Sequence, residues 1–191
     1  MNLVIELNSQ AKLKNGAVIS LLGNHELYPY YLKNDIKFKN DYIKTVDINN
    51  YKKQFNLSRN KFLQPGNLGG ELFARTRPLI LQLGEFLFIH GSITDLLIEN
   101  NINSKGYVDI SKINKETSNW LNGNRSVPEY LKDMDDYNPL FSRLYSSNKS
   151  LPLNDCKKIK NQLSYFKNAK YIVVGHSNYK NINSTCNNKV W

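Results

Sequence analysis

The chain has 191 residues, a length that suits one domain with a substantial core and does not require a second. Its formal net charge is +10, but only five of its 26 cationic residues are arginine, and they are spread along the chain beside 28 asparagines. Because arginine is the better residue for forked recognition of phosphate, this composition argues against a nucleic-acid-binding stripe. No apolar run approaches the ~18 residues of a membrane span, so no membrane partner is expected.

The N-terminal residues and the cysteines favour a cytoplasmic location. Residues 1–14 lack the charged leader, long apolar core and small-residue cleavage site of a signal peptide. Cys156 and Cys186 are too few for a disulfide scaffold and do not have the spacing of a metal-binding pair. We therefore expect a reducing, cytoplasmic environment.

The first part of the chain predicts a helix, a strand and an insertion. Apolar residues recur at helical spacing over residues 3–14, and Asn15-Gly16 is expected to end that helix. Residues 17–22 form a short apolar run bounded by glycines, which predicts a buried strand. The polar, aromatic and Asn-rich residues 28–70, with a break at 64–67, are predicted to form a helical insertion or cap on a single domain spanning 1–191.

The middle of the chain has a clearer pattern. Two apolar runs, 79–83 and 86–89, are separated by Gly84-Glu85 and predict a hairpin. Residues 92–124 are predicted to be helical in pieces. The core contacts expected from this region are Ile110, Ile113, Trp120 and Leu121.

The last part of the chain predicts a helix followed by strands. The helix is amphipathic, with Asn154 and Asp155 as its cap candidates. Its apolar positions at helical spacing are Cys156, Ile159, Leu163 and Phe166. A strand is predicted over 171–174, and residues 181–191 are predicted to add further strand and turn.

The three histidines share one kind of position. His25, His90 and His176 each follow an apolar, strand-like run and stand beside or near a glycine. One such histidine would most often be structural, but three indicate a site, because α/β folds assemble their sites at the C-terminal edge of the sheet. Neutral imidazoles with the amide oxygen of Asn24 suit a catalytic divalent metal, and the absence of cysteine there argues against a structural zinc cage.

Three motifs at these positions resemble a known family. Residues 23–26 (Gly-Asn-His-Glu), 88–91 (Phe-Ile-His-Gly) and 173–176 (Val-Val-Gly-His), in this order, are similar to the third, fourth and fifth motifs of the calcineurin-like metallophosphoesterases. Residues 138–143 and 182–191 resemble segments of the Shewanella-like protein phosphatases, within the phosphoprotein-phosphatase branch. The resemblance covers essentially the whole chain and implies an α/β fold of the αββα sandwich type.

The resemblance also implies a function and a set of roles. It implies a metal-dependent phosphatase acting on a phosphoserine, phosphothreonine or phosphotyrosine side chain, or on a small phosphate ester. Asn24, His90 and His176 would hold one metal of a dinuclear pair, expected to be manganese, or else iron or zinc. His25 would be the general acid that protonates the departing oxygen, and Arg143 would bind phosphate oxygens through its fork.

The chain also departs from the family pattern. Glu26 is expected to fix the loop rather than to bind metal, Ser92 replaces the second Gly of the usual His-Gly-Gly, and residues 177–179 replace the usual Thr-Pro-Gln. The family's first two motifs, Asp-x-His and Gly-Asp-x-x-Asp-Arg-Gly, do not occur in the chain, and they would carry the ligands of the first metal. The sandwich is therefore expected to be incomplete, lacking its first strands and exposing apolar edges on residues 18–22.

Three hypotheses about function remain open at this point. In the first, the chain is the C-terminal part of a phosphatase that works with a separate N-terminal fragment. In the second, it is a catalytically inactive remnant that binds phosphate or phosphopeptides as an interaction module. A third, nucleic-acid binding, would show affinity that falls steeply with salt and is disfavoured by the few arginines.

Overall fold

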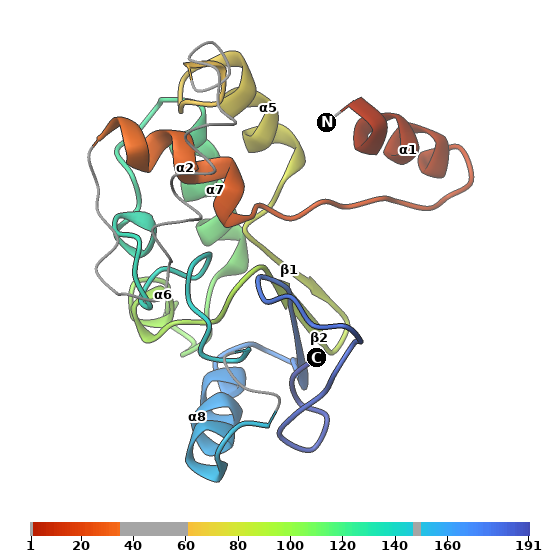
Figure 1. Ribbon diagram of the computed structural model, residues 1–191, viewed down its shortest axis with the longest axis vertical. Helices are drawn as coiled ribbons and strands as arrows, with labels where there is room; N and C mark the ends of the chain where they lie inside the picture. Colours follow the sequence, from red (N-terminus) through yellow and green to blue (C-terminus); the bar gives the residue numbers. More distant parts are fainter. Residues whose placement is uncertain (1, 35–60, 147–149) are drawn as a thin grey trace.

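The computed structural model describes residues 2–34, 61–146 and 150–191 (Figure 1). Residues 35–60, most of the predicted insertion or cap, lie outside the described residues, so that prediction stays a prediction. The elements in chain order are α1 (Asn2–Lys12), α2 (Asn24–Lys33), α5 (Leu68–Thr76), β1 (Ile80–Leu83), β2 (Phe86–Ile89), α6 (Asp95–Glu99), α7 (Ile110–Leu121), the 3-10 helix η1 (Glu129–Leu131), α8 (Leu153–Ser164) and β3 (Tyr171–Val174).

The sheet has three strands in the order β1-β2-β3. β1 and β2 form the predicted antiparallel hairpin, with Leu83 opposite Phe86 and with Gly84 at φ 57°, a conformation that suits glycine. β2 and β3 are parallel, with Ile89 opposite Val174, and the crossover between them contains α6, α7 and α8. The two strands therefore end side by side, and the backbone N–H of Gly175 donates to the carbonyl of His90 at 2.9 Å.

The helices that follow β2 bury three of the four residues predicted for the core, and Ile110 is only partly buried. α7 begins at its cap residue Asp109, whose carboxylate accepts from the N–H of Lys112 at 2.9 Å. Ile113, Trp120 and Leu121 are all buried, and α7 packs against both α5 and β1. The prediction of helical pieces over residues 92–124 is confirmed by α6 and α7.

The strand predicted over residues 17–22 does not form. These residues are extended, but no strand lies beside them in the described parts of the chain, and Val18 and Ile19 are exposed. Only Leu22 is buried, and its N–H donates to the carbonyl of Pro78 at 3.0 Å. An apolar run becomes a strand only when a partner completes its hydrogen-bond ladder, and none does so here.

Both terminal helices agree with the predictions in position but differ in their ends. α1 stands apart from the other elements on an extended connection, and Asn15, not Gly16, takes the left-handed conformation after it, with φ 59° (Figure 1). α8 is capped by Pro152, so the predicted caps Asn154 and Asp155 lie within its first turn. Pro152 has non-helical backbone angles, φ −57° and ψ 153°, and the helix begins directly after it at Leu153 without a side-chain cap.

The predicted α/β class is confirmed. The described residues contain one small sheet with helices, and a second sheet, which an αββα sandwich requires, is not among them. None of the described helices is both long enough and apolar enough to span a membrane.

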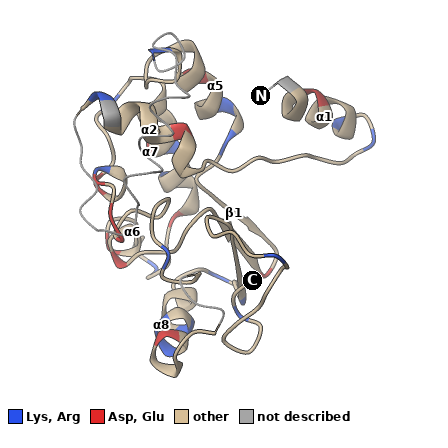
Figure 2. Cartoon of the chain, viewed as in Figure 1, with Lys and Arg blue, Asp and Glu red and all other residues tan. Residues whose placement is uncertain are grey.

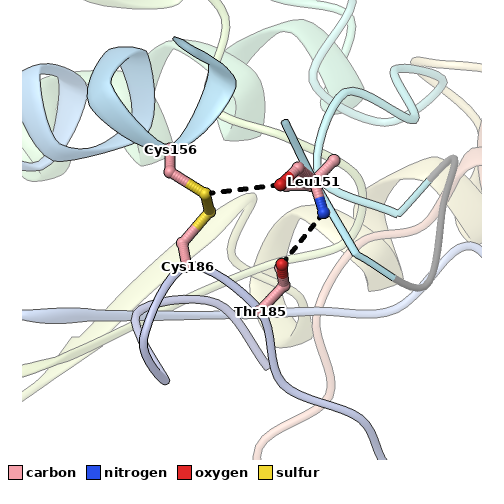
Figure 3. Close-up of a disulfide and its surroundings, with 4 residues drawn as sticks. All are labelled: Leu151, Cys156, Thr185 and Cys186. Atoms are coloured by element: carbon pink, nitrogen blue, oxygen red, sulfur yellow. Dashed lines mark hydrogen bonds between the residues drawn. A yellow bond between two sulfur atoms is a disulfide. The ribbon is translucent and has the colours of Figure 1, made fainter. Parts of the chain in front are cut away.

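The two cysteines differ from the expectation for a reducing environment. Cys156 in α8 and Cys186 near the C-terminus form a disulfide, with Cα atoms 5.2 Å apart, a normal separation for such a bond (Figure 3). The two cysteines lie 30 positions apart and carry no sequence signal for pairing, since the pairing depends on how α8 lies against residues 182–191. The cellular compartment stays a prediction.

Candidate metal centre

Two strand ends and one helix start bring three side chains together. His90 follows β2, His176 follows β3 after Gly175, and Asn24 is the first residue of α2. The Nε2 atom of His90 lies 2.9 Å from Oδ1 of Asn24 and 3.1 Å from Nδ1 of His176. The three residues predicted to bind one metal thus place three ligand atoms around a common point.

The spacing of these atoms fits a metal ion. Ligand atoms about 2.1 Å from a metal, at right angles to one another, lie about 3 Å apart, which matches the two separations measured from His90 Nε2. In a neutral ring, His90 Nε2 either carries one proton or accepts one. Without an ion, it therefore cannot make good hydrogen bonds to both Asn24 Oδ1 and His176 Nδ1. An ion at the common point would satisfy all three atoms, and two imidazoles with one amide oxygen suit a borderline or hard divalent metal.

Neighbouring residues orient Asn24 and make room for the histidine ring. The Nδ2 group of Asn24 donates to the hydroxyl of Tyr28 at 3.3 Å, which turns Oδ1 toward His90. A Cβ on Gly23 would lie only 3.3 Å from the His90 ring and 2.9 Å from a carboxylate oxygen of Glu26. The glycine that precedes Asn24 is therefore needed for the close approach of α2 to β2.

Burial keeps both histidines neutral, the form that binds metal. Burial, followed by the charges of His25 and Arg143, lowers the pKa of His90 to about 4. Burial, followed by the charge of Arg143, lowers the pKa of His176 to about 3, although the nearby backbone of Phe141 acts in the opposite direction. Neither ring needs to lose a proton before it binds an ion at neutral pH.

His176 is held in an unusual backbone conformation. Its φ is 63°, in the left-handed region that non-glycine residues rarely adopt. Its Nε2 atom is buried and has no hydrogen-bond partner among the described residues. Unfavourable backbone conformations of this kind are common at functional sites. In this conformation the Nδ1 atom of His176 faces His90.

Glu26 lies in the loop-fixing position that was predicted for it. One of its carboxylate oxygens accepts from the N–H of Gly23 at 2.8 Å, which caps the start of α2. The other oxygen pairs with Arg77 at 2.7 Å, and both side chains are largely buried. Each carboxylate oxygen of Glu26 thus has a partner that ties it to the start of α2 or to Arg77.

His25 and Arg143 lie at the edge of the cluster. His25 does not follow a strand as expected, but is the second residue of α2, because the run before it has no strand partner. Its ring is exposed and lies edge-on to Tyr28 at 5.0 Å. Arg143 is half-buried and makes no ion pair with a described residue, while its charge acts on both His90 and His176.

The segment that carries Arg143 is fastened to the end of β2. The carbonyl of Pro139 accepts from the N–H groups of Gly91 and Ser92 at 3.1 and 3.0 Å, and a Cβ on Gly91 would lie 2.5 Å from that carbonyl oxygen. The Ser92 hydroxyl donates to the carbonyl of Ser142 at 3.2 Å. The departure at Ser92 therefore strengthens this junction rather than changing the ligand cluster.

The second departure, residues 177–179, makes a similar anchor on the other side. Ser177 and Ser146 share a hydrogen bond between their hydroxyls at 2.8 Å, and the Tyr179 hydroxyl donates to the carbonyl of Ser146 at 2.6 Å. A cavity of about 330 Å³ lies beside this anchor, between Gly175 and Trp191. A larger cavity of about 480 Å³ is lined by Arg143 together with Thr94, Ser142 and Gln162.

Sequence reasoning missed several residues of this site. Arg77, Tyr28 and Ser146 each orient or anchor a predicted residue, yet none stands in a recognisable motif. Arg77 lies 51 residues from Glu26, so only the fold brings the pair together. The spacing of four positions between Asn24 and Tyr28 on one helix face is the signal that could have found Tyr28.

The distribution of charged residues and a search for other metal-binding groups both bear on the cluster of Asn24, His90 and His176. Figure 2 shows Lys and Arg interspersed with Asp and Glu over the described elements. Within residues 2–34, 61–146 and 150–191, no group of three or more His, Cys, Asp and Glu side chains could hold a metal. The cluster with Asn24 is therefore a two-histidine site that lacks a carboxylate.

Comparison with known proteins points to one family. A family model described as calcineurin-like phosphoesterase matches residues 2–179. An uncharacterized protein of Acanthamoeba polyphaga mimivirus is 26% identical over 206 residues, which cover 94% of this chain and 79% of that protein. No solved structure matches the chain significantly.

Proposed function

Because the chain belongs to the calcineurin-like phosphoesterase family, we propose that it is a metal-dependent phosphoester hydrolase whose metal is held by Asn24, His90 and His176. The observation that carries this proposal is the convergence of three ligand atoms at the ends of β2, β3 and the start of α2. Proteins of this family generally depend on a dinuclear metal centre. Such a centre supplies an activated water and neutralises charge on the phosphate oxygens.

The chain's own residues would bind the phosphate and supply a proton. Arg143 is half-buried and makes no ion pair with a described residue, and its fork would grip two phosphate oxygens. The N-terminus of α2 adds partial positive charge at the same place. His25, exposed on the first turn of α2, would give its proton to the departing oxygen.

The substrate we propose is a phosphorylated protein side chain. This rests on residues 138–143 and 182–191, which resemble the phosphoprotein-phosphatase branch. The exposed position of His25 also suits a large leaving group that stays in solvent. Manganese is the proposed metal because an amide oxygen is a hard ligand, with iron and zinc as the other candidates.

We further propose that a separate polypeptide completes the site. Val18 and Ile19 are 37% and 47% exposed in an extended segment that has no strand partner among the described residues. The cluster has no carboxylate ligand among those residues, whereas a dinuclear centre needs several. A partner fragment that pairs with this segment would cover the apolar edge and bring the missing acids.

The lack of a carboxylate ligand among the described residues also favours a second candidate function. A site with two histidines and an asparagine, but no acid, would bind a metal weakly and would not activate water by itself. In that case the chain would be a phosphate-binding or phosphopeptide-binding module that uses Arg143 and His25 without turnover. The two functions predict different results in the same experiment.

The test is hydrolysis of p-nitrophenyl phosphate with manganese, by the chain alone and mixed with a polypeptide carrying the Asp-x-His and Gly-Asp-x-x-Asp-Arg-Gly motifs. The hydrolase proposal predicts turnover in at least the mixture. His25→Ala should then lose turnover but keep phosphate binding, as measured by calorimetry, and Arg143→Ala should lose both. Arg125→Ala is the matched control, because Arg125 pairs with Glu116 at 3.1 Å and is not in the site.

The outcomes separate the two functions. Phosphate binding that requires Arg143, without hydrolysis under any metal or in the mixture, would establish the binding module and reject the hydrolase. Equal loss in Arg143→Ala and Arg125→Ala would contradict both.

A further inference from the structure

The last residues of the chain form an extra edge on the sheet. The N–H of Ile172 donates to the carbonyl of Lys189 at 2.8 Å, and the N–H of Trp191 donates to the carbonyl of Ile172 at 2.9 Å. The N–H of Val174 donates to the carbonyl of Trp191 at 2.8 Å. Residues 189–191 therefore run beside β3 up to the strand end that carries His176.

A turn in an unfavourable conformation leads into this edge. Cys186, Asn187 and Asn188 have φ angles of 54°, 53° and 60°, so three successive non-glycine residues are left-handed. Each such residue costs free energy because its Cβ approaches the backbone, and a run of them persists only where other contacts hold it. Hydrogen bonds from the N–H of Lys189 to the carbonyls of Thr185 and Cys186, at 3.1 and 3.2 Å, close the turn.

The disulfide fastens that turn to α8. Figure 3 shows Cys186 bonded to Cys156, and the Thr185 hydroxyl accepting from the N–H of Leu151 at 3.1 Å. Both cysteines are only partly buried. Cys156 lies early in α8, where the helix dipole stabilises a thiolate and makes it a better leaving group in exchange.

We propose that the Cys156–Cys186 disulfide is a redox-sensitive clasp that holds residues 186–191 against β3. A dithiol reductant would attack one sulfur, the protein disulfide would break, and the reductant would be left as its own disulfide. Two electrons and two protons pass to Cys156 and Cys186, which end as thiols. The unfavourable turn then loses its covalent anchor and releases the edge.

The release would open the surroundings of His176. The wall of the 330 Å³ cavity is built from both sides of this edge, including Gly175, Ser177, Thr185 and Trp191. Freed residues 189–191 would unpair from β3 and leave the His176 loop with one fewer support. This inference does not depend on the proposed hydrolysis, because it concerns only the backbone beside the cluster.

The test compares amide hydrogen exchange of the oxidised protein with that of the protein reduced by dithiothreitol. The clasp predicts that the amides of Ile172, Val174 and Trp191 exchange about tenfold faster or more after reduction, while the β1–β2 hairpin is unchanged. Reoxidation should restore slow exchange. Equal protection in the two states, or uniform loss of protection over the whole chain, would overturn the proposal.

Two glycine variants test the contribution of the turn. In the reduced protein, Asn187→Gly should recover part of the lost protection, because glycine adopts a positive φ without strain. Asn168→Gly is the matched control, since Asn168 also has a positive φ, of 65°, but lies outside the clasp. If protection from exchange recovers in both variants, or in neither, the proposal that the disulfide holds a strained turn in place would be contradicted.

Discussion

Residues 17–21 and residues 189–191 both run in extended conformation, but of the two only the second segment makes a backbone ladder with a described strand. Val18 and Ile19 leave 37% and 47% of their surface exposed, whereas Val190 leaves 2%. The N-terminal segment is anchored mainly at its ends, by Asn8, whose side-chain oxygen accepts from the N–H of Val18 at 3.0 Å, and by the bond from Leu22 to Pro78.

The comparison shows that a pairing partner, rather than apolar content, decides which of the two segments joins the sheet. The apolar content of residues 17–21 is higher than that of residues 189–191, yet the C-terminal segment is the paired one. Pairing with β3 and the covalent anchor at Cys186 outweigh intrinsic preference, in keeping with the strong context dependence of strand formation. Residues 189–191, which pair with β3, therefore support the strand end that carries His176. Residues 17–21, which precede Asn24, have no strand partner among the described residues.

The largest expected difference is between two isoleucines, one from each region. Ile172→Ala on β3 removes a fully buried side chain and should lower the free energy of unfolding by about 3 kcal/mol. Ile19→Ala in the exposed segment should change it by less than about 0.5 kcal/mol. Chemical denaturation of the two variants gives both values, and a comparable loss at Ile19 would show that residues 17–21 are buried in solution.

The junction at the end of β2 can be compared with the end of β3 through two glycines. Gly91→Ala places a Cβ 2.5 Å from a backbone oxygen and should cost about 2 kcal/mol. Gly175→Ala meets only ordinary contacts, at 3.7 Å or more, and should cost less than about 1 kcal/mol. Thermal melting of both proteins measures the difference, and the reverse order would contradict the described packing of residues 139–143 on Gly91.

The buried histidines of the paired region give stability a pH dependence. In the unfolded chain His90 and His176 bind protons near pH 6.5, but in the folded chain burial lowers their pKa values to about 4 and about 3. The contribution of these two histidines to the free energy of unfolding is fully present above pH 6.5. It falls at lower pH, because the unfolded chain binds protons there and the folded chain does not, and it stops falling only below about pH 3. With both rings partly exposed to solvent, a loss of about 2 kcal/mol is expected between pH 7 and pH 4.5.

Urea denaturation at pH 7.5, 6.0 and 4.5 measures this loss. His90→Gln keeps the ring's approximate volume and removes one titrating group, so its stability should fall less over the same range. Identical pH profiles for the two proteins would show that His90 is not neutral by burial.

The smallest expected effect concerns the pair that fixes the start of α2. Arg77→Met removes the charge beside Glu26 but keeps much of the side chain's apolar length. Because the pair is largely but not fully buried, the loss of stability should be about 1 kcal/mol. A double-mutant cycle with Glu26→Gln measures the coupling, and a coupling of zero would contradict the described contact.

The parts of the site that could be predicted from the sequence are those set by local pattern. His90 and His176 were placed correctly because each ends an apolar run that does form a strand, and parallel neighbouring strands end together. His25 was placed wrongly because residues 17–22 have the composition of a strand but no partner. Periodicity describes one segment at a time and cannot report whether a second segment lies beside it.

The contacts that could not be predicted are those between distant segments. The pairing of Glu26 with Arg77 and of Cys156 with Cys186 depends on how helices are set against loops, which no spacing rule encodes. The cap of α8 was misplaced by two residues because asparagine and aspartate are common caps, whereas Pro152 starts this helix. These residues tie the site together without belonging to any motif.

The central claim is that Asn24, His90 and His176 hold a metal ion, and a manganese titration followed by electron paramagnetic resonance of the free ion tests it most directly. The account predicts one bound ion per chain and an affinity that falls about tenfold or more in His176→Ala. His25→Ala, on an exposed residue of the same site region, should bind manganese as the unmodified protein does. Equal binding by the unmodified protein and His176→Ala would contradict the claim.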